Sequence, residues 1–161
     1  MANLNNIFNP LFLKNRELKI ALELLFFAIK DFDRNISFLL KKFGYNKTHF
    51  AVIFLASNNY YLTIKDLLII LDIKKQSLSK IIKKLKSDEI ITLKKSKKDK
   101  RNKNIYLKKK GLKIEKKITN KQINNIANAY KNAGKDSING FKKILLNLLS
   151  KTSKTILRNK I

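Results

Sequence analysis

The spacing of apolar residues changes abruptly near residue 90, and this change restricts the folds that the chain can adopt. Residues 74–89 carry apolar side chains three and four positions apart, which is the repeat of an amphipathic helix. Residues 89–95 and 104–108 instead alternate apolar and polar side chains, as half-buried strands do. The helical stripe consists of Leu78, Ile81, Ile82 and Leu85, and the alternating positions are Ile91, Leu93, Ile105 and Leu107. A helix followed directly by two strands is therefore predicted.

The segment between the two predicted strands, residues 95–103, is strongly basic, and Asp99 is its only acidic residue. A disordered basic tail would not be framed by two alternating segments, so a β-hairpin with this segment at its tip is the favoured interpretation. We refer to the hairpin, residues 91–107, as the wing.

A short helix is predicted immediately before residues 74–89. Thr63 and Asp66 stand three residues apart at the start of an apolar run, which matches a capping box and predicts a helix to about Leu71. Two helices joined by so short a turn, the second with a basic outer face, are typical of a helix-turn-helix.

Longer helices are predicted on both sides of this unit. The helical period runs through residues 15–43 and stops at Gly44, and Asn46 is the predicted cap of a helix that ends near Ser57. The period returns from residue 109 to about 134. Its apolar and partly polar face is expected to carry Leu112, Glu115, Ile118, Gln122, Ile126 and Tyr130.

One last helix is predicted from a cap at Asp136 to Ile156. With one proline and four glycines in 161 residues, few positions interrupt helices. The predicted fold is therefore mainly α-helical with a small β-hairpin, a winged helix-turn-helix with long terminal helices. Its length suits a single domain, residues 1–161.

The charge of the chain points to an acidic partner. Lysine and arginine number 37 against 11 acidic residues, a formal net charge of +26, and such a surface attracts nucleic acid or an anionic membrane. The chain has no cysteine and one histidine, His49, so disulfides and a His/Cys zinc site are excluded. His49 is expected on the surface or at a helix cap.

No pattern of an enzyme is present in the sequence: there is no Ser/His/Asp set, no phosphate-binding glycine loop and no inward-facing carboxylate pair. The protein is therefore predicted not to be an enzyme and to need no cofactor or metal. The N-terminal residues do not read as a signal peptide, and the apolar run near Glu23 is too short to span a bilayer. A cytoplasmic location, with no membrane partner, is expected.

The order of the predicted elements resembles the MarR (multiple antibiotic resistance regulator) family of winged-helix transcription regulators. The resemblance covers roughly residues 16–156 and is most specific from residue 62 to residue 111. The family's Asp-x-Arg signature corresponds to Asp99-Lys100-Arg101, and its strand ending in leucine before a glycine corresponds to Leu107 and Gly111. Two residues depart from the family pattern: Glu89 stands where a turn glycine is common, and Lys108 where a capping threonine is common.

The resemblance implies a homodimer, most often a repressor, whose two-fold symmetry matches a pseudo-palindromic operator. Residues 46–108 would form the DNA-binding lobe, and residues 11–45 and 109–161 the dimerisation region, which would bury Phe26, Phe27, Phe141, Leu148, Leu149 and Ile156. Many relatives are released from DNA by small aromatic acids, so a small-molecule effector is a further implied partner. The sequence assigns no residues to its binding.

Double-stranded DNA is the expected partner, because an α-helix fits the major groove, where base edges can be distinguished. Once the apolar stripe is buried, the second helix exposes residues for bases and for phosphates. Those expected nearest the bases are Lys75, Gln76, Ser77 and Ser79, and those expected on phosphates are Lys80, Lys83 and Lys84. The wing adds Lys97, Lys98, Asp99, Lys100 and Arg101, with Arg101 suited to a narrow minor groove and Asp99 to holding the hairpin tip.

Two other functions are compatible with so basic a chain. A non-specific nucleoid-associated or RNA-binding protein is the main alternative to a sequence-specific regulator. A peripheral membrane protein is the other, but it would need basic and aromatic residues together on an interfacial helix. The basic face here follows a helix-turn-helix, which favours DNA.

Overall fold

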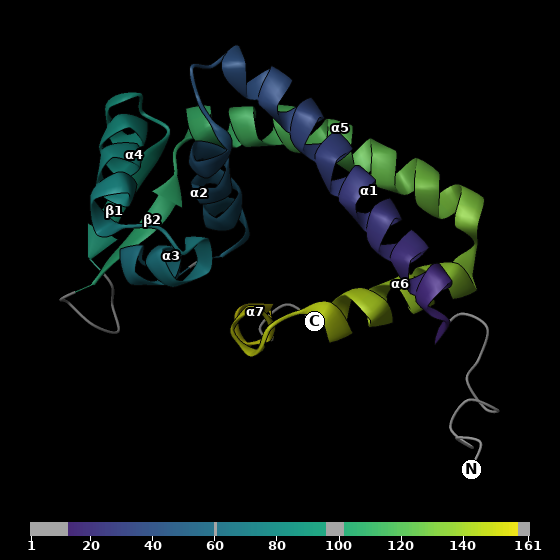
Figure 1. The fold of residues 1–161 in the computed structure, drawn as a ribbon. Helices are drawn as coiled ribbons and strands as arrows, with labels where there is room; N and C mark the ends of the chain where they lie inside the picture. The colour runs from purple at the N-terminus through teal and green to yellow at the C-terminus, as the bar shows by residue number, and fades with distance from the viewer. Residues whose placement is uncertain (1–12, 60, 96–101, 158–161) are drawn as a thin grey trace.

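The computed structural model describes residues 13–59, 61–95 and 102–157. In these residues the elements follow the predicted order, and the mainly helical fold with one hairpin is confirmed (Figure 1). The helices are α1 (Asn15–Lys41), α2 (Lys47–Asn58), α3 (Ile64–Leu71), α4 (Lys75–Ser87), α5 (Lys109–Ala133), α6 (Lys135–Leu148) and α7 (Lys151–Leu157). The strands are β1 (Ile91–Lys95) and β2 (Lys103–Leu107).

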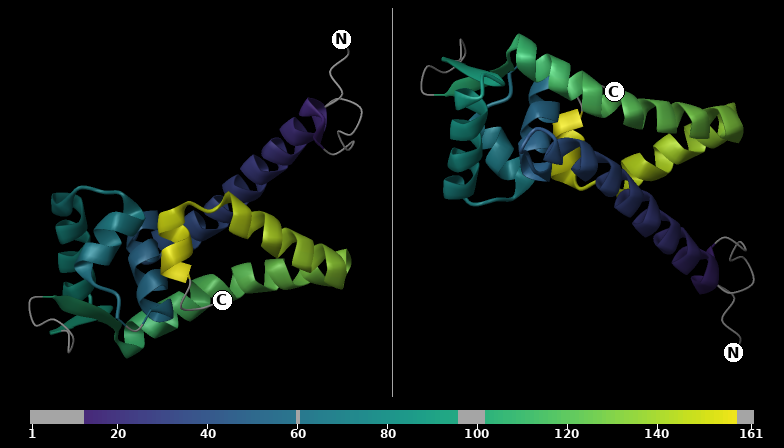
Figure 2. Two further views of the ribbon diagram at one scale, coloured as in Figure 1. Left: turned by 90° about the horizontal axis from the view of Figure 1, so that it is seen from below. Right: turned by 90° about the horizontal axis from the view of Figure 1, so that it is seen from above.

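The chain forms one lobe and an extended set of helices. Helices α2, α3 and α4 and the hairpin make the lobe, and α1 and α5 run away from it (Figure 1). At the far end α6 turns back from α5, while the N-terminal half of α1 points away from both (Figure 2). Within the described ranges, no helix is both long and apolar enough to cross a membrane.

The core lies in the lobe, where the predicted helical stripe is buried. Leu78, Ile81, Ile82 and Leu85 of α4 are at most 8% exposed. They pack in one cluster with Leu40 of α1, Val52 and Ile53 of α2, Leu67 of α3 and Ile114 and Ile118 of α5. Burial of this stripe fixes which side of α4 faces solvent.

Both predicted helix caps are present. The amide of His49 donates to Asn46 Oδ1 (3.1 Å), and the amide of Asp66 donates to Thr63 Oγ1 (3.1 Å). In return Asp66 Oδ2 accepts from the amide of Thr63 (2.9 Å), which completes a capping box. His49 has the expected capping role, because its ring contacts both the amide and the side chain of Asn46.

The two predicted strands of the wing are present and pair with each other. Ile91 lies opposite Leu107 and Leu93 opposite Ile105 in an antiparallel ladder. The amide of Ile105 also donates to the carbonyl of Leu62 (2.9 Å), beside a bridge between Thr63 and Asn104. The base of the wing is thus bonded to the start of α3.

The prediction of one last helix capped by Asp136 was wrong. Helix α6 has Gly134 at its N-cap, and Asp136 lies in its first turn. The helix stops at Leu148, because Leu149 has an extended backbone and Ser150 begins a new cap whose Oγ accepts from the amide of Ser153 (3.1 Å). A cap so placed favours a new helix start over continuation.

The prediction for the inner face of α5 was partly wrong. Ile118 and Gln122 are buried as expected, but Leu112 is 50% exposed and Ile114 takes the inner position instead. The rotation of α5 about its axis is restricted at Gly111, because this residue packs directly against the carbonyl of Ile90 and leaves no space for a Cβ.

Glu89 adopts the left-handed backbone conformation (φ 60°) that the turn glycine of the related family would adopt without strain. We expect Glu89→Gly to raise the midpoint of thermal unfolding by roughly 2–4 °C. The ion pair that it removes, between Glu89 Oε1 and Lys108 Nζ (2.9 Å), is exposed and contributes little. Thermal melts followed by circular dichroism measure this. The control Glu89→Ala removes the same pair but keeps Cβ, and an equal rise there would contradict the assignment to backbone strain.

Candidate nucleic-acid interface

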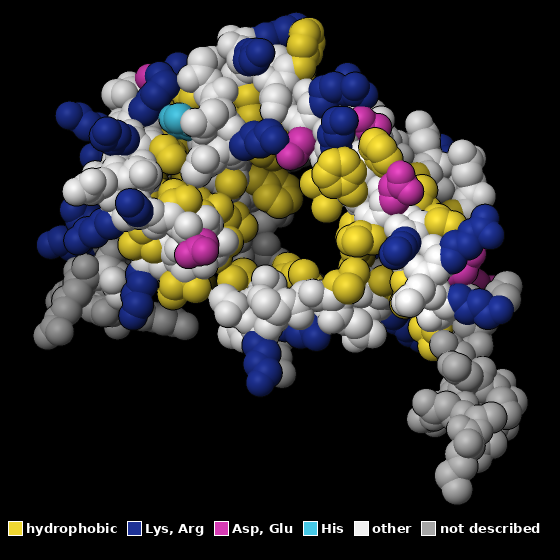
Figure 3. All heavy atoms as spheres, viewed as in Figure 1, with side chains coloured by type: hydrophobic (Ala, Val, Ile, Leu, Met, Phe, Trp, Pro, Cys, Tyr) yellow, Lys and Arg dark blue, Asp and Glu magenta, His cyan; other side chains and the backbone are white. Residues whose placement is uncertain are grey.

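The outer face of α4 carries the polar residues that the sequence assigned to DNA. Because the apolar stripe of this helix packs into the lobe, the remaining side chains point to solvent. Lys75, Gln76, Ser77, Ser79, Lys80, Lys83 and Lys84 are all exposed. In the space-filling view, lysine and arginine side chains gather along this edge of the lobe (Figure 3).

The start of α4 is open to an anion. Its N-cap residue, Lys74, makes no side-chain capping bond, and the first turn has no acidic residue. Helix N-termini of this kind present backbone N–H donors and the positive end of the helix dipole. Lys75 and Gln76 lie at this end, so side-chain and backbone donors occur together.

A shallow hollow runs between α4 and β1. It is lined by Ser79, Ile82, Lys83, Lys86, Ser87 and Leu93. Sequence reasoning did not select Lys86, although its exposed position one turn after Ile82 and Lys83 follows from the same helical period. Lys94 and Lys95 of β1 and Lys103 of β2 add exposed charges beside it.

Lys84 differs from the other exposed residues of α4, because its ammonium already has partners. Lys84 Nζ donates to Asp88 Oδ2 (3.0 Å) and lies 5.5 Å from the centre of the Tyr45 ring. The Tyr45 hydroxyl donates to the same Asp88 oxygen (2.9 Å), and Lys110 Nζ donates to the Asp88 carbonyl (2.9 Å). The end of α4 is thereby joined to the α1–α2 connection and to the start of α5.

These contacts shift the acidity of the groups involved. The hydrogen bonds from Lys84 and then Tyr45 lower the pKa of Asp88, so its carboxylate is held ionised. Burial, followed by the bond to Asp88, raises the pKa of Tyr45. Burial and the charge of Lys84 lower the pKa of His49, whose ring stacks on Tyr45 with centroids 5.3 Å apart. At neutral pH the Asp88 carboxylate is therefore an anion beside the ammonium groups of Lys84 and Lys110, and the two rings are neutral.

The wing residues Lys97, Lys98, Asp99, Lys100 and Arg101 lie outside the described residues. The strands that lead to them are described, and their last pair is Lys95 opposite Lys103. Strand β1 packs beside α4, so the hairpin and the exposed helix face belong to one side of the lobe (Figure 1).

A second exposed surface is apolar. Phe26 and Phe27 of α1 are 60% and 49% exposed, and Phe141 and Leu148 of α6 are 47% and 66% exposed. Every residue from 13 to 30 is exposed, although this stretch includes many large apolar side chains. Exposed apolar surface on this scale marks an interaction site.

A family model described as MarR family matches residues 39–102 of the chain. A curated relative, the HTH-type transcriptional regulator PetP of Rhodobacter capsulatus, is 28% identical over 135 residues, which cover 84% of this chain and 81% of the relative. The family-model match includes the helix-turn-helix and most of the wing.

Solved structures of similar fold come from several bacteria. The regulator Tm0710 of Thermotoga maritima has a TM-score of 0.61 and 17% identity, with 88% of this chain and 96% of that one covered. A SlyA-like regulator of Listeria monocytogenes has a TM-score of 0.63 and 22% identity, with 86% and 93% covered. A mutant MarR of E. coli, solved in complex with operator DNA, has a TM-score of 0.59 and 18% identity, with 88% and 100% covered. At these identities the likeness establishes the fold; the first two proteins are described as transcription regulators and the third is bound to operator DNA.

Proposed function

We propose that the chain is a transcription regulator of the MarR family, which the matching family model and the curated relative support. It is proposed to bind a pseudo-palindromic DNA operator as a homodimer and to repress transcription. The observation that carries this proposal is the exposed polar face of α4, which stands on a buried stripe at the edge of the lobe. A related fold has been solved with operator DNA bound. The net charge of +26 supplies the attraction to phosphates.

The proposed contacts divide between bases and backbone. Lys75, Gln76, Ser77 and Ser79 would lie nearest the base edges, where glutamine suits adenine and lysine suits guanine. Lys80 and Lys83 would contact phosphates, and Lys86 joins them because it lines the hollow beside β1. In the wing, Lys97, Lys98, Asp99, Lys100 and Arg101 keep their sequence-based roles, with Arg101 in the minor groove.

The homodimer is proposed to form through the terminal helices, residues 11–45 and 109–161, leaving residues 46–108 as the DNA-binding lobe. Support comes from the exposed apolar residues of α1 and α6, which one copy of the chain leaves in water. A two-fold dimer would present two α4 helices to successive major grooves.

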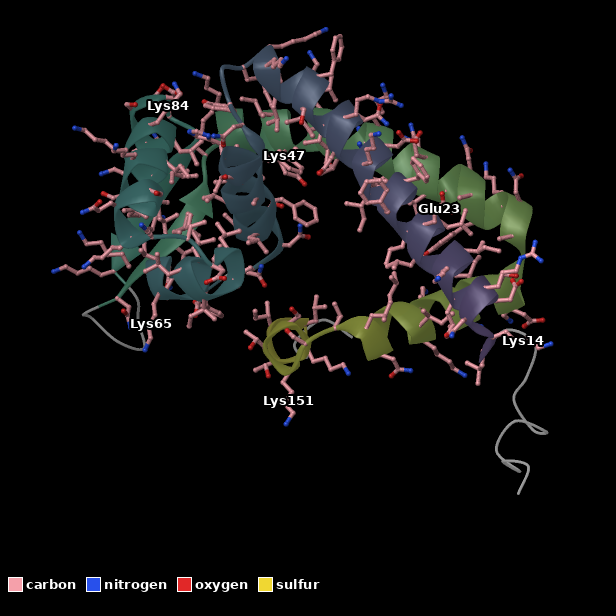
Figure 4. The ribbon with its side chains drawn as sticks, viewed as in Figure 1. Lys14, Glu23, Lys47, Lys65, Lys84 and Lys151 are labelled. Atoms are coloured by element: carbon pink, nitrogen blue, oxygen red, sulfur yellow. The ribbon has the colours of Figure 1, made fainter. Side chains whose placement is uncertain are left out.

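An effector site is proposed between α1 and the start of α2, in keeping with release by a small aromatic acid. The hollow there is lined by Phe26, Ile29, Lys30, Asp33, Arg34, Ser37 and Lys47. Apolar side chains beside cationic ones suit an aromatic carboxylate. Lys47 Nζ donates to Asp33 Oδ2 (2.7 Å) across the two helices, so an arriving carboxylate would compete with Asp33 (Figure 4). As a regulator acting on DNA without a membrane partner, the protein is proposed to work in the cytoplasm.

Selection of bound duplexes from random-sequence DNA, followed by fluorescence anisotropy with unrelated competitor DNA, tests this function. We expect a pseudo-palindromic site to emerge and to be bound at least about 10³-fold more tightly than unrelated DNA at one fixed salt concentration. Equal affinity for all duplexes, or a preference for RNA, would instead support the non-specific alternative.

A further inference from the structure

The acidic residue that ends α4 has a fixed position. Asp88 is the C-cap of α4, and its Oδ2 accepts from the Tyr45 hydroxyl (2.9 Å), 43 residues away in the sequence. Tyr45 is 7% exposed and belongs to the core cluster, so its hydroxyl is an immobile donor. The carboxylate is thus held in place by a buried group rather than by solvent.

Lys84 is held by this carboxylate from one turn earlier on the same helix. Its ammonium lies 3.0 Å from Asp88 Oδ2 and 5.5 Å from the centre of the Tyr45 ring. An exposed ion pair between two free side chains contributes little, because ordering both of them costs entropy. Here one partner is already ordered by Tyr45 and an aromatic ring adds a second attraction, so the lysine is held more firmly than in an ordinary surface pair.

The position of Lys84 would otherwise place it among the phosphate-binding lysines. It follows Lys83 directly and stands four residues after Lys80, so it lies on the same side of the helix as Lys80. A lysine on a phosphate raises affinity for every sequence alike, because phosphate contacts carry no sequence information. Keeping the Lys84 ammonium away from the phosphates would therefore lower the affinity for non-specific DNA.

Resting on the proposed function, we propose that Asp88, anchored by Tyr45, keeps Lys84 off the DNA and so limits sequence-independent binding by α4. This revises the sequence-based expectation that Lys84 contacts phosphate. Asp88 is a positioning residue in this scheme, and it acts through Lys84. Lys80 and Lys83 remain the phosphate contacts of this part of the helix.

The dependence of binding on salt tests the proposal, because log K falls with log salt and each lysine on a phosphate adds about 0.9 to the steepness of that fall, here called the slope. Binding of the full chain to a random-sequence duplex is measured by anisotropy over a salt series. We expect Lys80→Gln to lower the slope by about 0.9 for each subunit on the DNA and Lys84→Gln to leave it unchanged. Asp88→Asn, which keeps an acceptor for Tyr45, should raise the slope by about 0.9 per subunit as Lys84 is released.

The double variant Asp88→Asn/Lys84→Gln is the matched control. It should return to the wild-type slope; a slope that stays steep would show that loss of the acidic charge itself acts on DNA, which overturns the proposal. A drop for Lys84→Gln equal to that for Lys80→Gln would also overturn it while leaving the proposed function intact. Absence of DNA binding by the wild-type chain would overturn both.

Discussion

Gly111→Ala is expected to lower the free energy of unfolding by about 3 kcal/mol, because overpacking against a rigid backbone is poorly tolerated. A Cβ at this position would lie 2.3 Å from the carbonyl oxygen of Ile90 and 3.2 Å from its carbonyl carbon. The same oxygen accepts from the amide of Lys108 (2.9 Å), and Ile90 is fully buried, so neither side can move without loss. The start of α5 and the turn after α4 would be forced apart.

Urea unfolding followed by circular dichroism measures this loss, and Gly140→Ala is the control. Gly140 lies within α6, and nothing lies within 4 Å of a Cβ built there. Alanine in a helix interior is more favourable than glycine by roughly 0.5–1 kcal/mol, so this variant should be slightly more stable than the wild type. Similar stability of the two variants would show that the close approach of Gly111 to Ile90 does not constrain the fold.

Phe26→Glu is expected to prevent formation of the proposed homodimer and to weaken operator binding by about 10²–10⁴-fold. The ring is 60% exposed in one chain, on the stretch of α1 proposed to pack against a second copy. A charge there would be buried without a partner on association. Loss of the dimer removes the gain from binding two linked half-sites, which is about 10²–10⁴ for bivalent contacts.

Sedimentation at micromolar concentration and anisotropy with the selected operator would detect these two changes. Phe54→Glu is the matched control, since Phe54 lies on α2, outside the proposed dimerisation region, is 43% exposed and receives the same charge change. Its ring lies 5.8 Å from that of Phe50 within the lobe, so this variant should remain dimeric. A Phe26→Glu protein that remains dimeric, or a monomeric wild type, would contradict the proposed interface.

Local sequence information was sufficient for the lobe. The stripe of α4, the caps at Asn46 and Thr63 and the alternation in β1 and β2 each involve residues within two helical turns or one strand. Such patterns can be recognised in a single sequence, because helix and strand periods and cap residues depend only on neighbouring positions. The exposed face of α4 follows directly once its stripe is buried.

Features that depend on distant contacts or on competing caps were not predictable in the same way. The hydrogen bond from Tyr45 to Asp88 joins residues 43 positions apart, which no helical or strand period relates. It changes the role expected of Lys84, because Asp88 also pairs with that lysine. Asp136 and Ser150 both have the chemistry of a cap, and the sequence pattern alone does not distinguish Ser150, which caps a helix, from Asp136, which lies inside the first turn of one. Glu89 gave no sign of its left-handed backbone except through the family glycine that it replaces.

The hydrogen bond from the Ile105 amide to the Leu62 carbonyl connects the wing to the segment just before α3. With the bridge between Thr63 and Asn104, it joins the hairpin to the start of the helix-turn-helix, so we expect the two to move together. In the proposed homodimer, a ligand bound between α1 and α2 that moves one against the other would then change the distance between the two α4 helices. Release from DNA would then follow from a change in the spacing of the two DNA-binding lobes, with the structure of each lobe unchanged.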